Sequence, residues 1–317
     1  MLSNERIYIL GGGAVGMSLA VFLSNQGRDV TVVRTSTGDV DPRQVEVTIT
    51  TADGTTRTAP VEMVSLAKLR SLDGIVVVTA KSYANDAIAA ALAGLNVSGP
   101  VVILQNGAGV EDAYLRLPAA RIYRCCMYCI SQKDAGDNAY RFIRVVPSPI
   151  GAMRGDPQEL DALVRQLDTA EFPFAVHGDI RREVWKKTTV NSVFNSICPL
   201  LEADNGIFAR DENAVRMARV VIDECLAVAH AMGIDLNADE VLRQILTLSS
   251  NGGGKLISTL QDINAGRPTE IEQMNLAIAR IGETLAPPVP ANVTRALGEM
   301  VRIKSALRRA ATPAPAG

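Results

Sequence analysis

A glycine loop near the N-terminus constrains the fold of this 317-residue chain more than any other feature. It follows the apolar run RIYIL and precedes an uncharged, apolar segment with the composition of a helix that extends to Gly27. In a strand–loop–helix unit with the spacing G-x-G-x-x-G, the first glycine makes a tight turn, the second lets a pyrophosphate approach the backbone, and the third lets the helix pack closely on the sheet. The helix N-terminus adds unpaired N–H groups and a positive dipole. An incidental glycine-rich turn is the alternative, but the flanking strand and helix favour a dinucleotide site. The predicted site consists of Gly11, Gly12, Gly13, Ala14, Val15 and Gly16.

The end of the next predicted strand bears on which dinucleotide binds. The run DVTVVR ends at Arg34, eighteen residues after Gly16, where a site for NAD(H) usually carries Asp or Glu for the ribose hydroxyls. Arg34 is followed by Thr35, Ser36 and Thr37, and a guanidinium beside hydroxyls suits a 2′-phosphate. We therefore predict NADP(H) as the cofactor. The alternative is that Arg34 is only a solvated residue at a strand end.

Charge and composition exclude several classes of protein. With 47% hydrophobic residues the chain can bury a large core, and with a net charge of -2 and no run of like charges it lacks a footprint for polyanions. The N-terminal residues do not have the pattern of a signal peptide, and no apolar run is long enough to cross a bilayer. We expect a cytoplasmic protein with neither a nucleic-acid partner nor a membrane association.

The cysteines and histidines offer little material for a metal site. Cys126-x-x-Cys129 resembles half of a zinc or redox motif, but no second ligand pair accompanies it. The alternation in IYRCCMYCI instead predicts that Cys125, Cys126 and Cys129 are buried thiols on one core strand. The five thiols indicate a reducing compartment, and only two histidines, His177 and His230, are present. We expect no metal.

The spacing of apolar residues predicts two domains. Short β-rich runs alternate with helix-length segments through residues 1–178, which indicates a mainly parallel sheet covered by helices. A hairpin is expected around the turn Asp53-Gly54, and residues 121–151 should extend the sheet. Residues 179–317 have long segments of helical period, one of which ends at Gly233, so we predict an all-helical second domain. Residues 311–317 are small and rich in proline and are expected to form a frayed tail.

Polar residues follow two of the predicted parallel strands. GIVVVTA leads into Lys81, and PVVILQ leads into Asn106-Gly107. Ligands of open parallel sheets gather at the carboxyl ends of strands, so both side chains are candidates for a ligand cleft. Ordinary strand-to-loop chemistry is the alternative, because Asn-Gly is a common turn.

Two polar clusters stand out in the predicted helical domain. Lys187, Asn191 and Asn195 are four residues apart and share one helix face among apolar neighbours. Such amides are either satisfied by a neighbouring helix or line a polar cavity. Further on, Gly266 should end one helix and Pro268 should start the next, which brings Ser258 and Glu270 near a helix junction. Glu270 could also simply complement a helix dipole in the first turn.

Six segments in order carry a resemblance along nearly the whole chain. They are GGGAVG at 11–16, AKS at 80–82, QNGAG at 105–109, WKKTTVNSVFN at 185–195, DNG at 204–206 and STLQDINAGRPTEIEQMN at 258–275. In these segments the chain resembles the ketopantoate reductases (2-dehydropantoate 2-reductases). The resemblance implies an α/β Rossmann-type N-terminal domain followed by an all-α domain like the C-terminal domain of 6-phosphogluconate dehydrogenase.

The resemblance also implies an activity and residue roles. The activity is NADPH-dependent reduction of ketopantoate to (R)-pantoate, a step of pantothenate and coenzyme A biosynthesis. Lys187 would be the general acid, and Lys81 would serve the cofactor and carbonyl region. Asn106 would contact both cofactor and substrate. The other substrate contacts would be Asn191, Asn195, Asn205, Ser258 and the catalytic carboxylate Glu270. The family's phosphate-binding Arg usually sits one place after the position of Arg34, so Thr35 occupies its place here.

Elementary chemistry agrees with the role of Lys187, since an ammonium can stabilise and protonate the oxygen of a carbonyl that receives hydride. Two alternatives stay open: an NADP-dependent reductase of another 2-keto acid, and a non-catalytic NADP(H)-binding sensor. A sensor would not need Lys187, Asn191 and Glu270 together. The expected partner is a small 2-keto acid, and a homodimer is the assembly that we consider, although no residue pattern indicates one.

Overall fold

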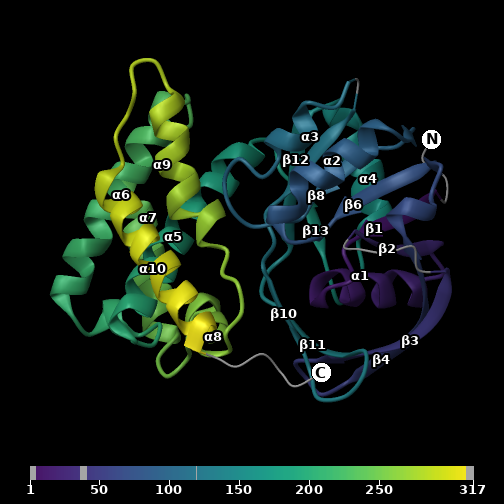
Figure 1. Cartoon of the computed structure of the whole chain (residues 1–317), viewed down its shortest axis with the longest axis horizontal. Coiled ribbons are helices and arrows are strands. Elements are labelled where there is room, and N and C mark those ends of the chain that lie inside the picture. Colours follow the sequence, from purple (N-terminus) through teal and green to yellow (C-terminus); the bar gives the residue numbers. More distant parts are fainter. Residues whose placement is uncertain (1–4, 36–40, 119, 312–317) are drawn as a thin grey trace. The chain divides into compact units, whose positions relative to one another are not determined.

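The structure is a computed structural model that describes residues 5–35, 41–118 and 120–311 (Figure 1). The chain divides into an N-terminal unit, Met1–Gln105 with Val110–Ile180, and a C-terminal unit, Asn106–Gly109 with Arg181–Gly317. The short segment Asn106–Gly109 thus belongs to the C-terminal unit although the chain on either side of it belongs to the other. The domain boundary after residue 178 stays a prediction, and Ser36, Thr37 and most of the predicted tail lie outside the described residues.

Within the described residues, an eleven-stranded sheet forms the centre of the N-terminal unit, in the order β10-β11-β3-β4-β2-β1-β6-β8-β9-β12-β13. Every neighbouring pair from β4 across to β9 is parallel, which confirms the predicted α/β class. The strands of this sheet are β1 (Arg6–Leu10), β2 (Val30–Arg34), β3 (Arg43–Thr51), β4 (Thr56–Ser65), β6 (Gly74–Val78), β8 (Val101–Ile103), β9 (Ile122–Cys125), β10 (Cys129–Lys133), β11 (Ala139–Arg144), β12 (Ser148–Arg154) and β13 (Phe174–Val176). A small parallel pair joins β5 (Ser71–Leu72) to β7 (Asn96–Val97).

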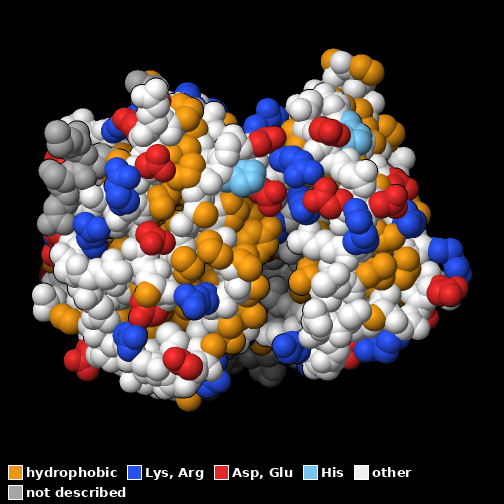
Figure 2. Space-filling view, turned by 180° about the vertical axis from the view of Figure 1, so that it is seen from behind, with side chains coloured by type: hydrophobic (Ala, Val, Ile, Leu, Met, Phe, Trp, Pro, Cys, Tyr) orange, Lys and Arg blue, Asp and Glu red, His pale blue; other side chains and the backbone are white. Residues whose placement is uncertain are grey.

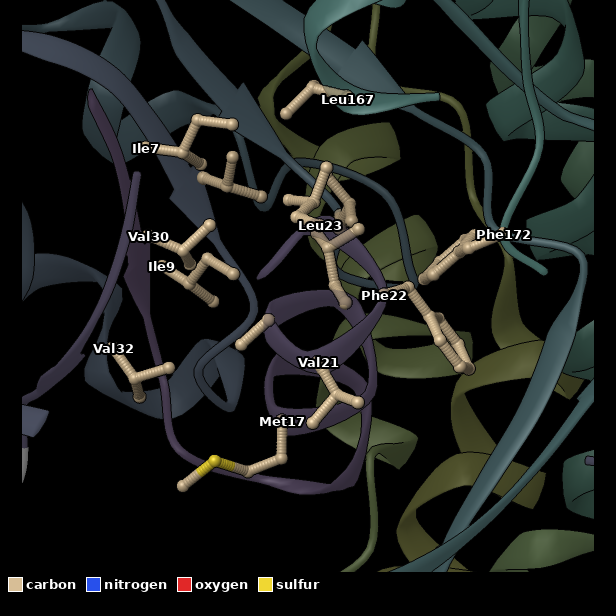
Figure 3. Packing of buried hydrophobic residues seen from close by; sticks show 14 of the residues in the cluster. Ile7, Ile9, Met17, Val21, Phe22, Leu23, Val30, Val32, Leu167 and Phe172 are labelled. Carbon is tan, nitrogen blue, oxygen red and sulfur yellow. The ribbon is translucent and has the colours of Figure 1, made fainter. Parts of the chain in front are cut away.

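Helices and 3-10 turns connect these strands. They are α1 (Ala14–Asn25), α2 (Asn85–Ala93), α3 (Asp112–Leu115) and α4 (Leu160–Leu167), with 3-10 turns η1 (Leu66–Lys68), η2 (Ser82–Ala84) and η3 (Pro157–Glu159). Helix α1 begins directly after the glycine loop and buries Met17, Val21 and Leu23. Figure 3 shows these side chains in one buried cluster with Ile7 and Ile9 of β1 and Val32 of β2. Each side chain of this size contributes about 1.5–3 kcal/mol when it is fully buried, so this packing anchors the glycine loop.

The predicted hairpin is confirmed in β3 and β4, which pair antiparallel from Arg43 to Thr50. Gly54 has φ +83 in the turn, a conformation that L side chains rarely adopt. Asp53 Oδ1 accepts hydrogen bonds from Thr51 Oγ1 at 2.5 Å and from the Thr55 backbone N–H at 3.0 Å. These hydrogen bonds stabilise the carboxylate and lower the pKa of Asp53 to about 2.

The segment around the clustered cysteines is not one strand, and this prediction was wrong. Strand β9 ends at Cys125, and β10 begins at Cys129 on the far edge of the sheet. Cys125 and Cys126 are buried and Cys129 is half-buried, and none of the five cysteines forms a disulfide. The chain crosses from an inner strand near one edge of the sheet to the opposite edge here, because β9 pairs with β8 and β12 whereas β10 pairs with β11. Alternation alone cannot detect such a break, since both strands have the same period.

The described part of the C-terminal unit is helical throughout, as predicted. Its helices are α5 (Ile180–Leu201), α6 (Glu212–Ala231), α7 (Ala238–Asn251), α8 (Ser258–Asn264), α9 (Asn275–Thr284) and α10 (Asn292–Ala311), with 3-10 turns η4 (Ile207–Ala209) and η5 (Ile271–Gln273). The Asp211 side chain caps α6 by accepting from the Ala214 N–H, and Gly233 at φ +74 follows the end of α6, which confirms that predicted end. Phe194 of α5 and Phe208 of η4 meet edge-on in the core, with ring centroids 4.9 Å apart.

The surface carries both signs of charge. Figure 2 shows Lys and Arg side chains interspersed with Asp and Glu on the face that it presents, as the net charge of -2 leads one to expect. Across residues 5–35, 41–118 and 120–311, none of the helices combines the length and the apolar character that crossing a membrane requires.

Candidate functional site

The glycine loop has the geometry that close approach of a phosphate group requires. Gly11 has φ +126, and a Cβ there would lie 2.4 Å from the Ala80 nitrogen. A Cβ on Gly16 would lie 2.0 Å from the Gly11 oxygen, so the helix packs too closely here for any side chain. Gly13 is exposed and caps α1, and a Cβ there would meet nothing within 4 Å. The backbone of this loop is therefore open to a ligand at Gly13, where the positive end of α1 begins.

The other loop residues and the two candidate cations lie in the same unit. Gly12, Ala14 and Val15 are half-buried around the start of α1. Arg34 is the last residue of β2 and is half-buried. Lys81 is exposed, follows β6 and precedes η2. Because β2, β1 and β6 are adjacent and parallel, these residues all lie beyond the carboxyl ends of neighbouring strands.

A buried amide network joins the ends of β6 and β8, and the sequence did not reveal it. Gln105 Nε2 donates to the Ala80 oxygen at 2.6 Å and to Asn85 Oδ1 at 2.7 Å. Asn85 Nδ2 donates to Gln105 Oε1 at 3.0 Å and to the Val110 oxygen at 2.9 Å. The Tyr114 hydroxyl donates to Asn85 Oδ1 at 3.0 Å, and burial raises the pKa of Tyr114, which keeps this phenol a donor. The network fixes the backbone just before Lys81 and just before Asn106.

A buried ion pair lies in the same region of the N-terminal unit. Arg124 of β9 is 1% exposed, and its Nε lies 3.3 Å from Oε2 of Glu111, whose side chain is 11% exposed. Arg124 Nη1 also donates to the Ile103 oxygen at 3.1 Å. Ile103 ends β8 and Glu111 precedes α3, so the guanidinium links both sides of residues 104–110. Its apolar sequence neighbours gave no signal for this pairing.

In the C-terminal unit, the structure brings the predicted acid Lys187 together with Asn106. Lys187 lies on α5, and its Nζ donates to Asn106 Oδ1 at 3.0 Å, across 81 residues of sequence. Asn106 is held by the segment that follows it: the Ala108 N–H donates to the Gln273 oxygen at 3.0 Å. A Cβ on Gly107 would lie 2.2 Å from that same oxygen. Gly107, at φ +100, thus permits the close approach that places Asn106 beside the ammonium.

The two asparagines of α5 differ in their surroundings. Asn195 is 2% exposed. Its Nδ2 donates to the backbone oxygen of Asn191 at 2.9 Å, and its Oδ1 accepts from Thr259 Oγ1 at 2.7 Å. These contacts are those expected of an amide satisfied by a neighbouring helix, here α8. Asn191 is half-buried one turn before it and one turn after Lys187. The sequence analysis did not single out Thr259 as the partner of Asn195. The only sequence feature that pointed near it was the neighbouring Ser258 in the segment 258–275.

The remaining predicted residues lie on other segments of the helical unit. Ser258 is exposed and begins α8, and Gly266 at φ +66 follows the predicted end of that helix. The prediction that Pro268 starts the next helix was wrong. Residues without regular secondary structure follow Gly266, and half-buried Glu270 precedes the 3-10 turn Ile271–Gln273 instead of lying in a first helical turn. The reason is that the chain must place the Gln273 oxygen against Gly107 and Ala108 before α9 begins.

Asn205 lies in the loop before η4 and is half-buried. Its backbone N–H donates to the backbone oxygen of Lys255 at 2.9 Å, and its backbone oxygen accepts from Ser249 Oγ at 2.7 Å. Within the described part of the chain, Asn205 Oδ1 is buried and has no hydrogen-bond partner. Such an acceptor is costly to bury and is free to bind a donor.

Comparison with known proteins places the chain. The model described as "Ketopantoate reductase PanE/ApbA" matches residues 7–142, and the one described as "Ketopantoate reductase PanE/ApbA C terminal" matches residues 179–304. The 2-dehydropantoate 2-reductase of Archaeoglobus fulgidus is 27% identical over 300 residues, which cover 94% of this chain and 97% of that protein. The protein of the same name from Pyrobaculum aerophilum is 27% identical over 240 residues, 74% of this chain and 78% of that protein.

Solved structures agree on the fold. A ketopantoate reductase of Ralstonia eutropha superposes with a TM-score of 0.81 at 24% identity, over 96% of this chain and 99% of that one. A D-mandelate dehydrogenase solved with NADH and anilino(oxo)acetate superposes with a TM-score of 0.79 at 21% identity, over 96% and 99% of the two chains. The two family matches together span most of the sequence: the first covers most strands of the sheet, and the second covers α5 to α9 and part of α10. The chain therefore belongs to the ketopantoate reductase family of oxidoreductases.

Proposed function

We propose that this protein reduces 2-dehydropantoate (ketopantoate) to (R)-pantoate with NADPH, as a step of pantothenate and coenzyme A biosynthesis. Family membership and the curated relatives named 2-dehydropantoate 2-reductase support ketopantoate reduction. The observation that carries the mechanism is the hydrogen bond from Lys187 Nζ to Asn106 Oδ1 at 3.0 Å. It holds a cation among half-buried polar side chains, where a carbonyl oxygen that gains charge can be stabilised.

The cofactor fits the residues that the N-terminal unit presents. The open backbone at Gly13 and the first N–H groups of α1 would bind the pyrophosphate, with Gly12, Ala14 and Val15 completing the loop. Arg34 would bind the 2′-phosphate, and Lys81 would face the nicotinamide half. When bound, NADPH supplies the hydride for the C2 carbonyl carbon.

Lys187 is the general acid of this proposal. As the carbonyl becomes tetrahedral, negative charge develops on its oxygen, and the ammonium both stabilises that charge and donates the proton that completes the alcohol. An ammonium has three N–H donors, and Asn106 accepts one of them, which fixes the direction of Nζ. Asn106 is thus the residue that orients the acid, besides its proposed contacts with cofactor and substrate.

Substrate contacts complete the proposal. Asn191 presents an amide one turn after Lys187, and the Ser258 hydroxyl would hold the substrate carboxylate. Glu270 would accept a hydrogen bond from the substrate hydroxyl. Asn205 Oδ1, which has no partner among the described residues, would accept a hydrogen bond from a donor of the substrate. Asn195 contributes chiefly by holding α5 against Thr259, because both polar atoms of its amide already have partners. A cytoplasmic location stays a prediction from the sequence, and a homodimer stays the assembly that we consider.

NADPH oxidation measured with a panel of 2-keto acids tests the proposal. The panel includes ketopantoate, other branched 2-keto acids and phenylglyoxylate, the keto acid that corresponds to mandelate. We expect the highest kcat/KM with ketopantoate. A higher value with another member would make the protein a reductase of that acid, and binding of NADPH without turnover of any member would favour the sensor.

Arg34 gives a prediction for the cofactor. Arg34→Ala should raise the Kd for NADPH about tenfold to hundredfold, since a charge-assisted hydrogen bond to phosphate is lost, and should change the Kd for NADH far less. Fluorescence titration of the nicotinamide measures both constants. Equal effects on the two cofactors would show that Arg34 does not contact the 2′-phosphate.

A further inference from the structure

A cavity of about 390 Å³ lies within the N-terminal unit where β2 and β4 end. Arg34 and Thr35 line one side of it, and Ser65 lines the same side because Arg34 and Ser65 are partners in the parallel register of β2 and β4. The wall continues through Leu69 and Arg70, which follow η1. The volume is that of an ordinary small-ligand pocket.

The charge in this cavity has one sign. Of the described residues that line it, two are arginines and none is Asp or Glu. Within residues 5–35, 41–118 and 120–311, neither Arg34 nor Arg70 has a hydrogen bond or an ion pair through its guanidinium. The neighbouring cation Lys68 is paired, since its Nζ lies 3.5 Å from Asp41 Oδ1. Two uncompensated guanidiniums at one cavity form a site for an anion, and their planar donor forks match a phosphate.

The rest of the lining is apolar. Leu69, Ile88 of α2 and Leu95 provide aliphatic surface, and Ile88 is 1% exposed. Aliphatic walls beside a cationic end suit a flat base attached to a phosphorylated sugar, because the base loses water contact while the phosphate is held by the guanidiniums. Free inorganic phosphate would use only the cationic end of such a cavity.

We propose that Arg70 is a second phosphate-binding residue, which acts with Arg34 on a phosphomonoester carried by the ribose of an adenine nucleotide. This inference rests on the proposed function, in which that nucleotide is NADPH. Arg34 reaches the cavity from the end of β2, and Arg70 reaches it from the segment after β4. Arg70 is thus a residue that sets specificity for a 2′-phosphate.

Calorimetric binding tests this assignment without turnover. The ligands are adenosine 2′,5′-bisphosphate, ADP, NADPH and NADH, and the proteins are the wild type, Arg70→Ala, Arg70→Lys and Arg34→Ala. Lys68→Ala is the matched control, since Lys68 lies two positions away but does not line the cavity. Arg70 is exposed, so its replacement leaves the core intact, which a thermal melt verifies.

We expect Arg70→Ala to weaken adenosine 2′,5′-bisphosphate and NADPH about tenfold or more, with ADP and NADH changed less than about twofold. Arg70→Lys should recover only part of the affinity, because the ammonium lacks the planar fork. Lys68→Ala should change none of the four constants by more than about twofold. Equal weakening of all four ligands by Arg70→Ala, or no weakening of any, would overturn the assignment. If the four binding constants come out as expected but the wild type does not reduce ketopantoate, only the proposed substrate is overturned.

Discussion

Replacement of Lys187 by alanine is expected to lower kcat for ketopantoate reduction by about 10²- to 10⁴-fold, the usual contribution of a positioned general acid. The physical reason is that the variant has no ammonium at this position to stabilise and protonate the developing alkoxide. Asn106 would keep its backbone contacts through Gly107 and Ala108, so the fold around it should survive. The Kd for NADPH should stay nearly unchanged. Steady-state kinetics and a cofactor titration on the same preparation give both values.

Lys186 provides the matched control, because it is the adjacent lysine and its Nζ pairs with Glu240 instead of Asn106. Lys186→Ala should keep kcat within a few-fold of the wild type. The kcat of Asn106→Ala should lie between the values of Lys186→Ala and Lys187→Ala, since this change removes the acceptor that directs the ammonium but keeps the ammonium itself. If Lys187→Ala kept near-normal turnover, another group would have to be the acid.

Replacement of Arg124 by methionine is expected to lower the free energy of unfolding by about 3–5 kcal/mol, the range measured when one partner of a buried ion pair is removed. The guanidinium is 1% exposed and lies beside the largely buried carboxylate of Glu111. Methionine replaces the aliphatic part of the side chain but not the guanidinium, so it leaves a buried negative charge and removes the donor to the Ile103 backbone oxygen. Urea unfolding followed by circular dichroism measures the loss.

Two companion variants separate charge from packing. The double variant Arg124→Met with Glu111→Gln should regain much of the lost stability, because a neutral amide costs less to bury than a lone carboxylate. Arg121→Met removes an ion pair with Glu159 whose side chains are both 33% exposed, and it should cost no more than about 1 kcal/mol. A loss as large for Arg121→Met as for Arg124→Met would mean that burial of the pair does not set its contribution.

Local features of the sequence predicted much of the fold because they act over a few residues. A buried strand, glycines at turn positions and an apolar helix define the nucleotide loop, and Gly54, Gly233 and Gly266 mark turns or helix ends at positive φ in the structure. The error at Pro268 has the opposite cause. Proline is compatible with a first helical turn, but the chain after Pro268 is irregular and continues into a 3-10 turn, whose Gln273 contacts Gly107 and Ala108.

Local sequence features predicted only part of the candidate site. The face shared by Lys187, Asn191 and Asn195 follows from helical period, yet which amide is already satisfied depends on Thr259, 64 residues beyond Asn195. The network of Asn85, Gln105 and Tyr114 joins segments that have no common period. Polar side chains of this kind look like surface residues in a sequence, because their partners come from other elements.

By itself the sequence determined that a dinucleotide loop opens an α/β unit, that helices follow, and that a lysine and several amides are candidates for a 2-keto acid site. Only the tertiary structure decided that Lys187 meets Asn106, that Arg124 is buried against Glu111, and that Arg70 shares a cavity with Arg34. Period and turn chemistry are properties of neighbouring residues along the chain. Hydrogen bonds, ion pairs and cavities are formed by residues that the sheet register and helix packing bring together, so their partners are visible only once the chain has folded.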